Sequence, residues 1–186
     1  MKLPINKFSF SGTFTKETKI SGGKILHIEQ LVGGKMPSVF PVAVKDECIP
    51  SHLKTGSEVY VGSASITRSS KRDIFKAGTI LHVLPQKVSL NEADISGIVT
   101  EIKSCGNGYA LTLKHGEEAP YIYVMAGKAA FDANHITEDD EILIMGGITY
   151  QKENAFWIRV TDPSQLILIE RGSPDKGIIQ AKDKFI

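Results

Sequence analysis

Two short segments carry aromatic side chains at alternate positions, and one of them also carries a cation. They are Tyr121-Ile122-Tyr123-Val124-Met125 and Ala155-Phe156-Trp157-Ile158-Arg159-Val160. Side chains alternate between the two faces of a β-strand, so a strand whose aliphatic residues face a core turns the remaining side chains outward. The outward residues are then Tyr121, Tyr123, Trp157 and Arg159. Bases stack on such rings and cations bind phosphates, which predicts a face for single-stranded nucleic acid.

Two lysines are expected to border this face. Leu111 and Leu113 point inward in the preceding strand, so Lys114 points out, and Lys152 lies in a loop at the rim. An outward ring can instead pack against another domain or subunit. For Trp157, the only tryptophan of the chain, both interpretations stay open. For the two tyrosines we favour the ligand face.

An internal repeat supplies the elements that position these residues. Ser11-Gly12-Thr13-Phe14-Thr15 resembles Ser96-Gly97-Ile98-Val99-Thr100, at an offset of 96 − 11 = 85 residues. Glu58-Val59-Tyr60-Val61-Gly62 resembles Glu141-Ile142-Leu143-Ile144-Met145-Gly146, at an offset of 141 − 58 = 83. Two matches at nearly equal offsets indicate two copies of one unit.

Each copy is predicted to contain five strands. Runs rich in Val, Ile, Tyr, Phe and Thr, broken by Gly, Asn, Asp or Ser, give strands near 8–18, 24–32, 39–45, 57–68 and 74–84, then near 94–103, 108–115, 120–126, 140–150 and 155–161. A short helix or turn is expected between the third and fourth strands, at 46–56 and 127–139. Gly12 and Gly97 are placed to relieve the bend of the first strand.

This pattern predicts an all-β chain of two tandem oligonucleotide/oligosaccharide-binding (OB) barrels. The expected domains are a first barrel over 1–88, a second over 89–170, and a C-terminal tail over 171–186. The linker, roughly 85–93, is short, so the barrels should lie close together.

Basic residues in the first copy form a second candidate surface. Arg68, Lys71 and Arg72 lie in the loop between the fourth and fifth strands, with Phe75 just beyond it, and Lys16, Lys19 and Lys24 flank the loop between the first two strands. In an OB barrel both loops are expected on one side, so we expect the six cations to converge on phosphates. The alternative is a set of solvated loop residues.

No motif of catalysis or metal binding is recognised. The chain has no phosphate-binding loop, no Gly-x-Ser-x-Gly elbow and no metal-ligand spacing among its histidines and cysteines. The turn at Asp139, Asp140 and Glu141 is interpreted as solvated rather than as an acid/base pair. We therefore expect no enzyme, no catalytic residues, no cofactor and no metal.

Bulk properties agree with a binding protein but do not themselves indicate nucleic acid. The 186 residues carry 22 basic and 21 acidic side chains, for a net charge of +1. Cys48 and Cys105 are far apart, which favours reduced thiols, and no secretory signal or membrane span is recognised. A cytoplasmic location is the expectation.

The chain resembles the single-stranded-DNA-binding proteins and the replication protein A modules. The likeness rests on Ser-Gly-x-x-Thr at Ser11 to Thr15 and Ser96 to Thr100, and on Gly56 to Val59 with its counterpart at Asp140 to Ile142. It covers about residues 8–170 and implies OB barrels and DNA binding. Bacterial members typically end in an acidic tail that recruits proteins, whereas this tail is mixed to basic and only Phe185-Ile186 is similar. A compact tandem form also resembles proteins that phages and mobile elements encode.

The leading hypothesis is a single-stranded-DNA-binding protein of low sequence specificity, acting in replication, recombination or transfer. Its partners would be single-stranded DNA, replication or recombination proteins, and further copies of itself, but no membrane. The alternatives are a protein-interaction adaptor of a replication or mobile-element complex, and an RNA-binding OB module.

Overall fold

The computed structural model describes residues 5–69, 72–77, 80–116 and 121–172, with only the backbone at 68, 69, 72 and 80. It is almost entirely β-structure, as the sequence predicts. The strands are β1 (Asn6–Ile20), β2 (Gly23–Val32), β3 (Met36–Lys45), β4 (Glu58–Ser69), β5 (Arg72–Lys76), β6 (Ile80–Val83), β7 (Asn91–Cys105), β8 (Gly108–Lys114), β9 (Tyr121–Gly127), β10 (Glu141–Lys152), β11 (Ala155–Val160) and β12 (Leu166–Glu170).

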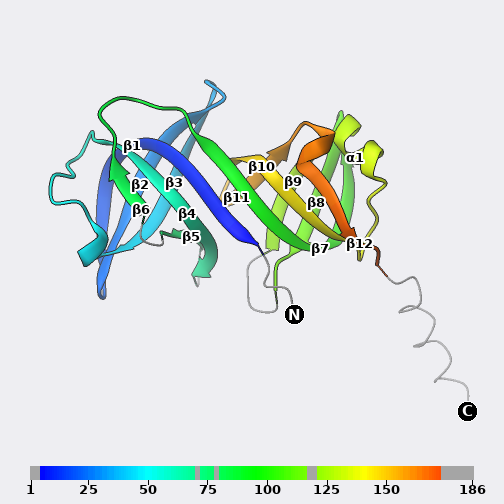
Figure 1. Ribbon diagram of the computed structural model, residues 1–186, viewed down its shortest axis with the longest axis horizontal. Helices are drawn as coiled ribbons and strands as arrows, with labels where there is room; N and C mark the ends of the chain where they lie inside the picture. The colour runs from blue at the N-terminus through cyan, green and yellow to red at the C-terminus, as the bar shows by residue number, and fades with distance from the viewer. Residues whose placement is uncertain (1–4, 70–71, 78–79, 117–120, 173–186) are drawn as a thin grey trace, which may run out of the picture.

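All these strands belong to one twelve-stranded sheet (Figure 1). In the first half, β1 to β6, strand β1 pairs with β2 and β4, and β3 pairs with β2 and lies parallel to β5, which pairs with β4. In the second half, β7 to β12, strands β7, β8, β9, β10 and β11 repeat this set of pairings. Strand β1 also pairs with β7, which joins the halves into one sheet.

The last strands of each half differ from the sequence expectation. The single strand expected at 74–84 is two strands, because β5 pairs with the end of β4 while β6 pairs with its beginning. In the second half β12 pairs with β10 and was not expected. The segments between the third and fourth strands hold a 3₁₀ turn, η1 (Asp46–Cys48), and a helix, α1 (Lys128–Asn134), and a second 3₁₀ turn, η2 (Pro163–Gln165), precedes β12.

Gly12 and Gly97 must be glycine because the neighbouring strand leaves no room for a side chain at either position. A Cβ at Gly12 would lie 2.4 Å from the carbonyl oxygen of Glu29, and one at Gly97 would lie 2.9 Å from that of Lys114. Both glycines precede an irregularity in the pairing with the next strand, after Phe14 and after Val99. The predicted glycine requirement therefore comes from the close approach of the neighbouring strand at this point of the sheet.

The buried core continues from one half into the other. The ring of Phe156, in β11, lies 5.7 Å from that of Phe40 and 4.9 Å from that of Phe75, both in the first half. Alternation along 155–161 predicts that Phe156 points into the second barrel; it is buried, but its ring packs against first-half rings. Polar contacts add to this packing, since the Gln151 side chain accepts from the Val39 N–H at 3.1 Å.

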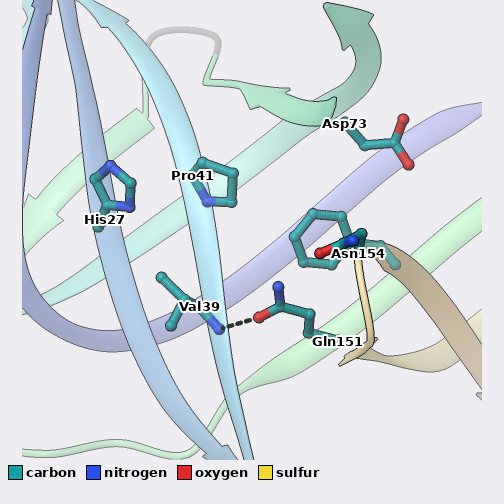
Figure 2. A pocket seen from close by; sticks show the side chains of 7 residues that line it. His27, Val39, Pro41, Asp73, Gln151 and Asn154 are labelled. Atoms are coloured by element: carbon teal, nitrogen blue, oxygen red, sulfur yellow. Dashed lines mark hydrogen bonds between the residues drawn. The ribbon is translucent and has the colours of Figure 1, made fainter. Parts of the chain in front are cut away.

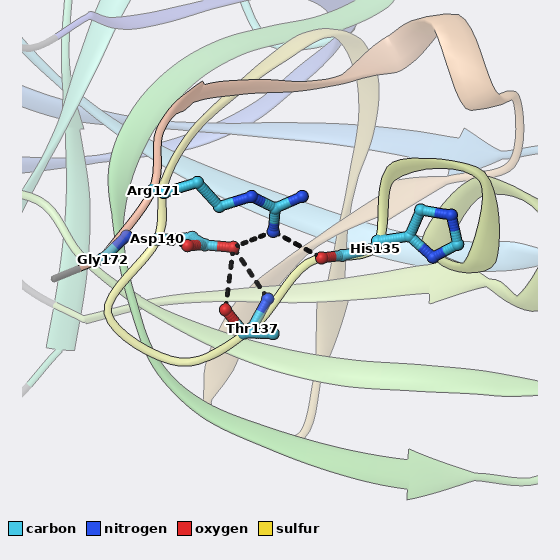
Figure 3. Close-up of polar contacts among 5 residues, drawn as sticks. All are labelled: His135, Thr137, Asp140, Arg171 and Gly172. Atoms are coloured by element: carbon cyan, nitrogen blue, oxygen red, sulfur yellow. Dashed lines mark hydrogen bonds and ion pairs between the residues drawn. The ribbon is translucent and has the colours of Figure 1, made fainter. Parts of the chain in front are cut away.

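A buried carboxylate holds the end of the described chain against the second half (Figure 3). Asp140 has no exposed surface. Its Oδ2 accepts hydrogen bonds from the Thr137 N–H and hydroxyl and from Arg171 Nη1 at 2.9–3.0 Å, and its Oδ1 accepts from the Gly172 N–H at 2.8 Å. Arg171 also donates to the His135 carbonyl. The expectation of a solvated turn is thus wrong for Asp140, because four donors converge on its side chain.

Asp140 is expected to make stability pH-dependent. Burial disfavours its charged form, but the hydrogen bonds from Gly172 and Thr137 and the charge of Arg171 outweigh this and lower its pKa. A lowered pKa stabilises the fold above the unfolded-state value of about 3.9, and this contribution is lost as pH falls through the folded-state pKa. Asp140→Asn should cost about 1–3 kcal/mol of unfolding free energy at pH 7, because an amide NH2 would replace one of the two carboxylate oxygens that accept from these donors.

Urea unfolding at pH 7 and at low pH measures both effects. The matched control is Asp139→Asn, since Asp139 is exposed and its φ of 69° suits asparagine. The difference between Asp140→Asn and wild type should shrink as the pH falls. A difference that stays constant with pH would contradict a role for the Asp140 charge.

Candidate nucleic-acid interface

The outer face of β8, β9 and β11 carries a stacked aromatic pair. Tyr123 and Trp157 are opposite each other in the parallel β9–β11 register, and their rings stack with centroids 5.2 Å apart at 26°. Lys152 Nζ lies 5.1 Å from the centroid of the Trp157 ring. Both rings are half-buried, since Ile122, Val124 and Ile158 alternate with them and fill the core. The predicted outward direction of both rings is therefore present in the structure.

Tyr121 extends this surface toward Lys114. The two residues are opposite each other in the β8–β9 register, both are exposed, and 46% of Tyr121 is accessible to solvent. Thr112 occupies the adjoining position, opposite Tyr123. We call Lys114, Tyr121, Tyr123, Lys152 and Trp157 the aromatic face.

Arg159 lies next along β11 on the same side as Trp157. Its guanidinium carbon is 5.2 Å from the centroid of the Tyr150 ring, and its Nη2 donates to Met36 Sδ at 3.4 Å. No carboxylate among the described residues forms an ion pair with it. Sulfur is a weak acceptor, so a half-buried guanidinium keeps donors available for an anion.

The cations of the first half are not brought together as expected. Lys16 and Lys19 are exposed on β1, but Lys24 forms an ion pair with Glu17 at 2.8 Å. The β1–β2 turn lies near Lys45, at the end of β3, because Gly23 pairs with Lys45. Strand β5 runs parallel to β3 with Phe75 opposite Val42, so Arg72 lies toward the beginning of β3.

This register places the β1–β2 turn and Arg72 toward opposite ends of β3, about 20 Å apart for six residues of strand. For the described cations, convergence of Lys16, Lys19 and Lys24 with Arg72 is therefore not supported. Arg68 and Arg72 are described by their backbone alone, and Lys71 lies outside the described residues.

Phe75 is not available for stacking, so its prediction as a binding residue is wrong. It is fully buried and its ring packs against Phe8, Phe10, Phe40 and Phe156. The repeat contained a signal for this outcome. Phe75 pairs with Val42 as Ile158 pairs with Val124, at an offset of 158 − 75 = 83, and Ile158 was already expected inside.

By the same correspondence, the described positions of the first half that are equivalent to the aromatic face carry none of its tyrosine or tryptophan rings. His27 pairs with Pro41 where Thr112 pairs with Tyr123, and Glu29 pairs with Val39 where Lys114 pairs with Tyr121. The position of Trp157 corresponds to Ile74, again at an offset of 83. A proline, two aliphatic residues and a carboxylate thus replace the three rings and the lysine, and this set does not suit the bases and phosphates of a nucleic acid.

A pocket of about 400 Å³ lies over this part of the first half, where the β10–β11 turn approaches β3 (Figure 2). His27, Val39, Pro41 and Asp73 contribute from the first half, and Gln151, Asn154 and Phe156 from the second. Among its described lining residues none is lysine or arginine, and Asp73 is acidic, so its chemistry does not favour phosphate.

Sequence reasoning missed Tyr150 and Met36, which hold Arg159, because their contacts depend on packing between strands distant in sequence. In the described ranges, no cluster of three or more His, Cys, Asp or Glu side chains could hold a metal ion. Among the same residues, no helix has the length and apolar character needed to cross a membrane.

Comparison with known proteins finds similarity in structure. No family model and no curated protein matches the sequence. Among solved structures, a deletion mutant of the single-stranded DNA binding protein from Thermus aquaticus superposes with a TM-score of 0.68 at 18% identity, over 95% of this chain and 100% of that chain. The wild-type protein gives 0.66 at 19% identity, over 95% and 98%. The likeness to single-stranded-DNA-binding proteins is thus confirmed as a shared fold.

Proposed function

We propose that this protein binds single-stranded DNA with low sequence specificity, on the aromatic face and Arg159. The observation that carries the proposal is the Tyr123–Trp157 stack with Lys152 over one ring and Arg159 two residues farther along β11. Bases of every kind present a π-face to such rings, while cations bind the backbone, which gives affinity without sequence readout. Replication, recombination or transfer of DNA are the processes in which such binding serves.

We further propose that the two halves are tandem OB barrels, over 1–88 and 89–170, followed by a tail over 171–186. Support comes from the repeated pairings and from a repeated pair of hydrogen bonds. In the first half, the Phe14 carbonyl accepts from the Gly56 N–H, and the Phe14 N–H donates to the Ser57 carbonyl. In the second half, Val99 makes the same two bonds, with the Asp139 N–H and the Asp140 carbonyl. The fold shared with the Thermus aquaticus protein, which its name describes as DNA-binding, agrees with this assignment.

The face of the first half favours a different role for that barrel. Of its equivalent positions, Pro41 and Ile74 are buried and Val39 is half-buried, so the exposed one is Glu29, whose carboxylate suits a protein partner better than DNA. An adaptor protein without DNA affinity is therefore the second candidate function. RNA would use the same rings, so competition between oligo-dT and oligo-U separates the two nucleic acids.

Titration with oligo-dT while Trp157 fluorescence is recorded tests the proposal. Stacking of a base on the only tryptophan should quench its emission, and affinity should fall as salt increases, because bound cations displace counterions. Absence of both quenching and salt-sensitive binding at micromolar protein would exclude DNA binding by this face. A partner protein captured in the absence of any oligonucleotide affinity would favour the adaptor.

A further inference from the structure

A hollow continues the aromatic face beyond Arg159. It has a volume of about 250 Å³ and lies where the β7–β8 turn approaches the ends of β9 and β11. Cys105 lines it from the end of β7, Gly108, Met125 and Gly127 line it from β8 and β9, and Arg159 lines it from β11.

The strand register connects this hollow to the stacked rings. Trp157 is opposite Tyr123, and Arg159 is opposite Met125, two residues farther along both strands. Two residues of strand span about 7 Å, close to two stacked nucleotides of a single strand at roughly 3.4 Å each. A strand that stacks on Tyr123 and Trp157 and continues along β11 therefore reaches the hollow next.

The chemistry of the hollow fits a nucleotide. Among the described lining residues there is no carboxylate, and Arg159 supplies a guanidinium whose one protein acceptor is the Met36 sulfur. Met125 offers a polarizable apolar contact for a base or sugar. Gly108 must remain glycine, because a Cβ there would lie 2.3 Å from the Ala126 carbonyl oxygen of the neighbouring strand, so this part of the lining is backbone.

We propose that this hollow is a second nucleotide subsite, in which Arg159 binds a backbone phosphate while Met125 and the backbone at Gly108 and Gly127 contact the attached nucleoside. The inference rests on the proposed function, because it extends the path of the same DNA strand. It adds a site at the β7–β8 turn that the stacked rings alone do not require.

Protection of Cys105 tests the subsite. The chain has two cysteines, so Cys48→Ser leaves the exposed Cys105 as the reporter. Its reaction with N-ethylmaleimide, an uncharged reagent, is measured with and without dT20 at saturation judged by Trp157 quenching. We expect DNA to slow the reaction at least tenfold. In the matched Cys105→Ser protein, reaction at Cys48 in the first half should not change.

The two proposals fail in different ways. Quenching of Trp157 with no protection of Cys105 overturns the subsite and leaves DNA binding on the rings. Absence of both quenching and salt-sensitive binding overturns the proposed function itself. Equal protection of Cys48 also overturns the subsite, because it means that DNA slows both thiols without local contact.

A variant that fills the hollow gives an independent measurement. A Cβ at Gly127 would lie 3.6 Å from the nearest atom, the Val160 carbonyl oxygen, so a side chain has room there. Gly127→Leu should weaken dT20 binding about tenfold with little change in thermal unfolding. Unchanged affinity in the folded variant overturns the subsite, and if the variant does not fold, protection of Cys105 decides.

Discussion

Replacing Tyr123 or Trp157 with alanine is expected to weaken oligo-dT binding by roughly 5- to 150-fold. Each base stacked on an aromatic ring contributes about 1–3 kcal/mol, and 1.4 kcal/mol corresponds to a factor of ten in affinity. The double variant should lose more than either single variant but less than the product of the two, because the rings stack on each other and are coupled. Anisotropy of labelled dT20 measures all three, since the variants lacking Trp157 have no tryptophan emission.

Tyr109 provides the matched control for these variants. It lies on β8 and its ring stacks on that of Phe131 in α1, with centroids 3.9 Å apart, but it belongs to the opposite side of the strand from Thr112. Tyr109→Ala should lower stability and leave dT20 affinity within a factor of two. Equal losses of affinity for Tyr109→Ala and Tyr123→Ala would mean that folding, and not base stacking, explains the effect.

Alternation was sufficient to predict the aromatic face. Ile122, Val124 and Ile158 form part of the core, and strand geometry then leaves Tyr123 and Trp157 outside. The strands carrying these residues, β9 and β11, lie within one residue of their expected positions at 120–126 and 155–161. Local periodicity decides such features, so one sequence is enough to reveal them.

Features that depend on register between distant strands were not predictable in this way. The expected cluster of six cations needs the two basic segments of the first half to meet, but the β3–β5 register places the β1–β2 turn and Arg72 toward opposite ends of β3. The Lys24–Glu17 ion pair and the contact of Arg159 with Met36 likewise follow from pairing and packing. Phe75 is the exception, because the 83-residue offset from Ile158 already indicated an inward direction.

Phe156 links the two halves of the molecule, because this residue of the second half completes the aromatic core of the first. Phe156→Ala should lower the free energy of unfolding by about 3–5 kcal/mol, the usual cost of removing a buried phenyl ring. For a chain of this size that corresponds to roughly 6–20 °C in Tm. Phe156→Leu should cost less, because most of the volume remains.

Calorimetry distinguishes a shared core from two independent ones. Wild-type protein should unfold in a single transition, since the β1–β7 pairing and the Phe40–Phe75–Phe156 contacts couple the halves. Phe131→Ala is the control, because this half-buried ring contacts Tyr109 within the second half. If Phe156→Ala costs no more than Phe131→Ala, the halves do not depend on a common core. If Phe156→Ala splits the transition in two, the ring itself couples the halves.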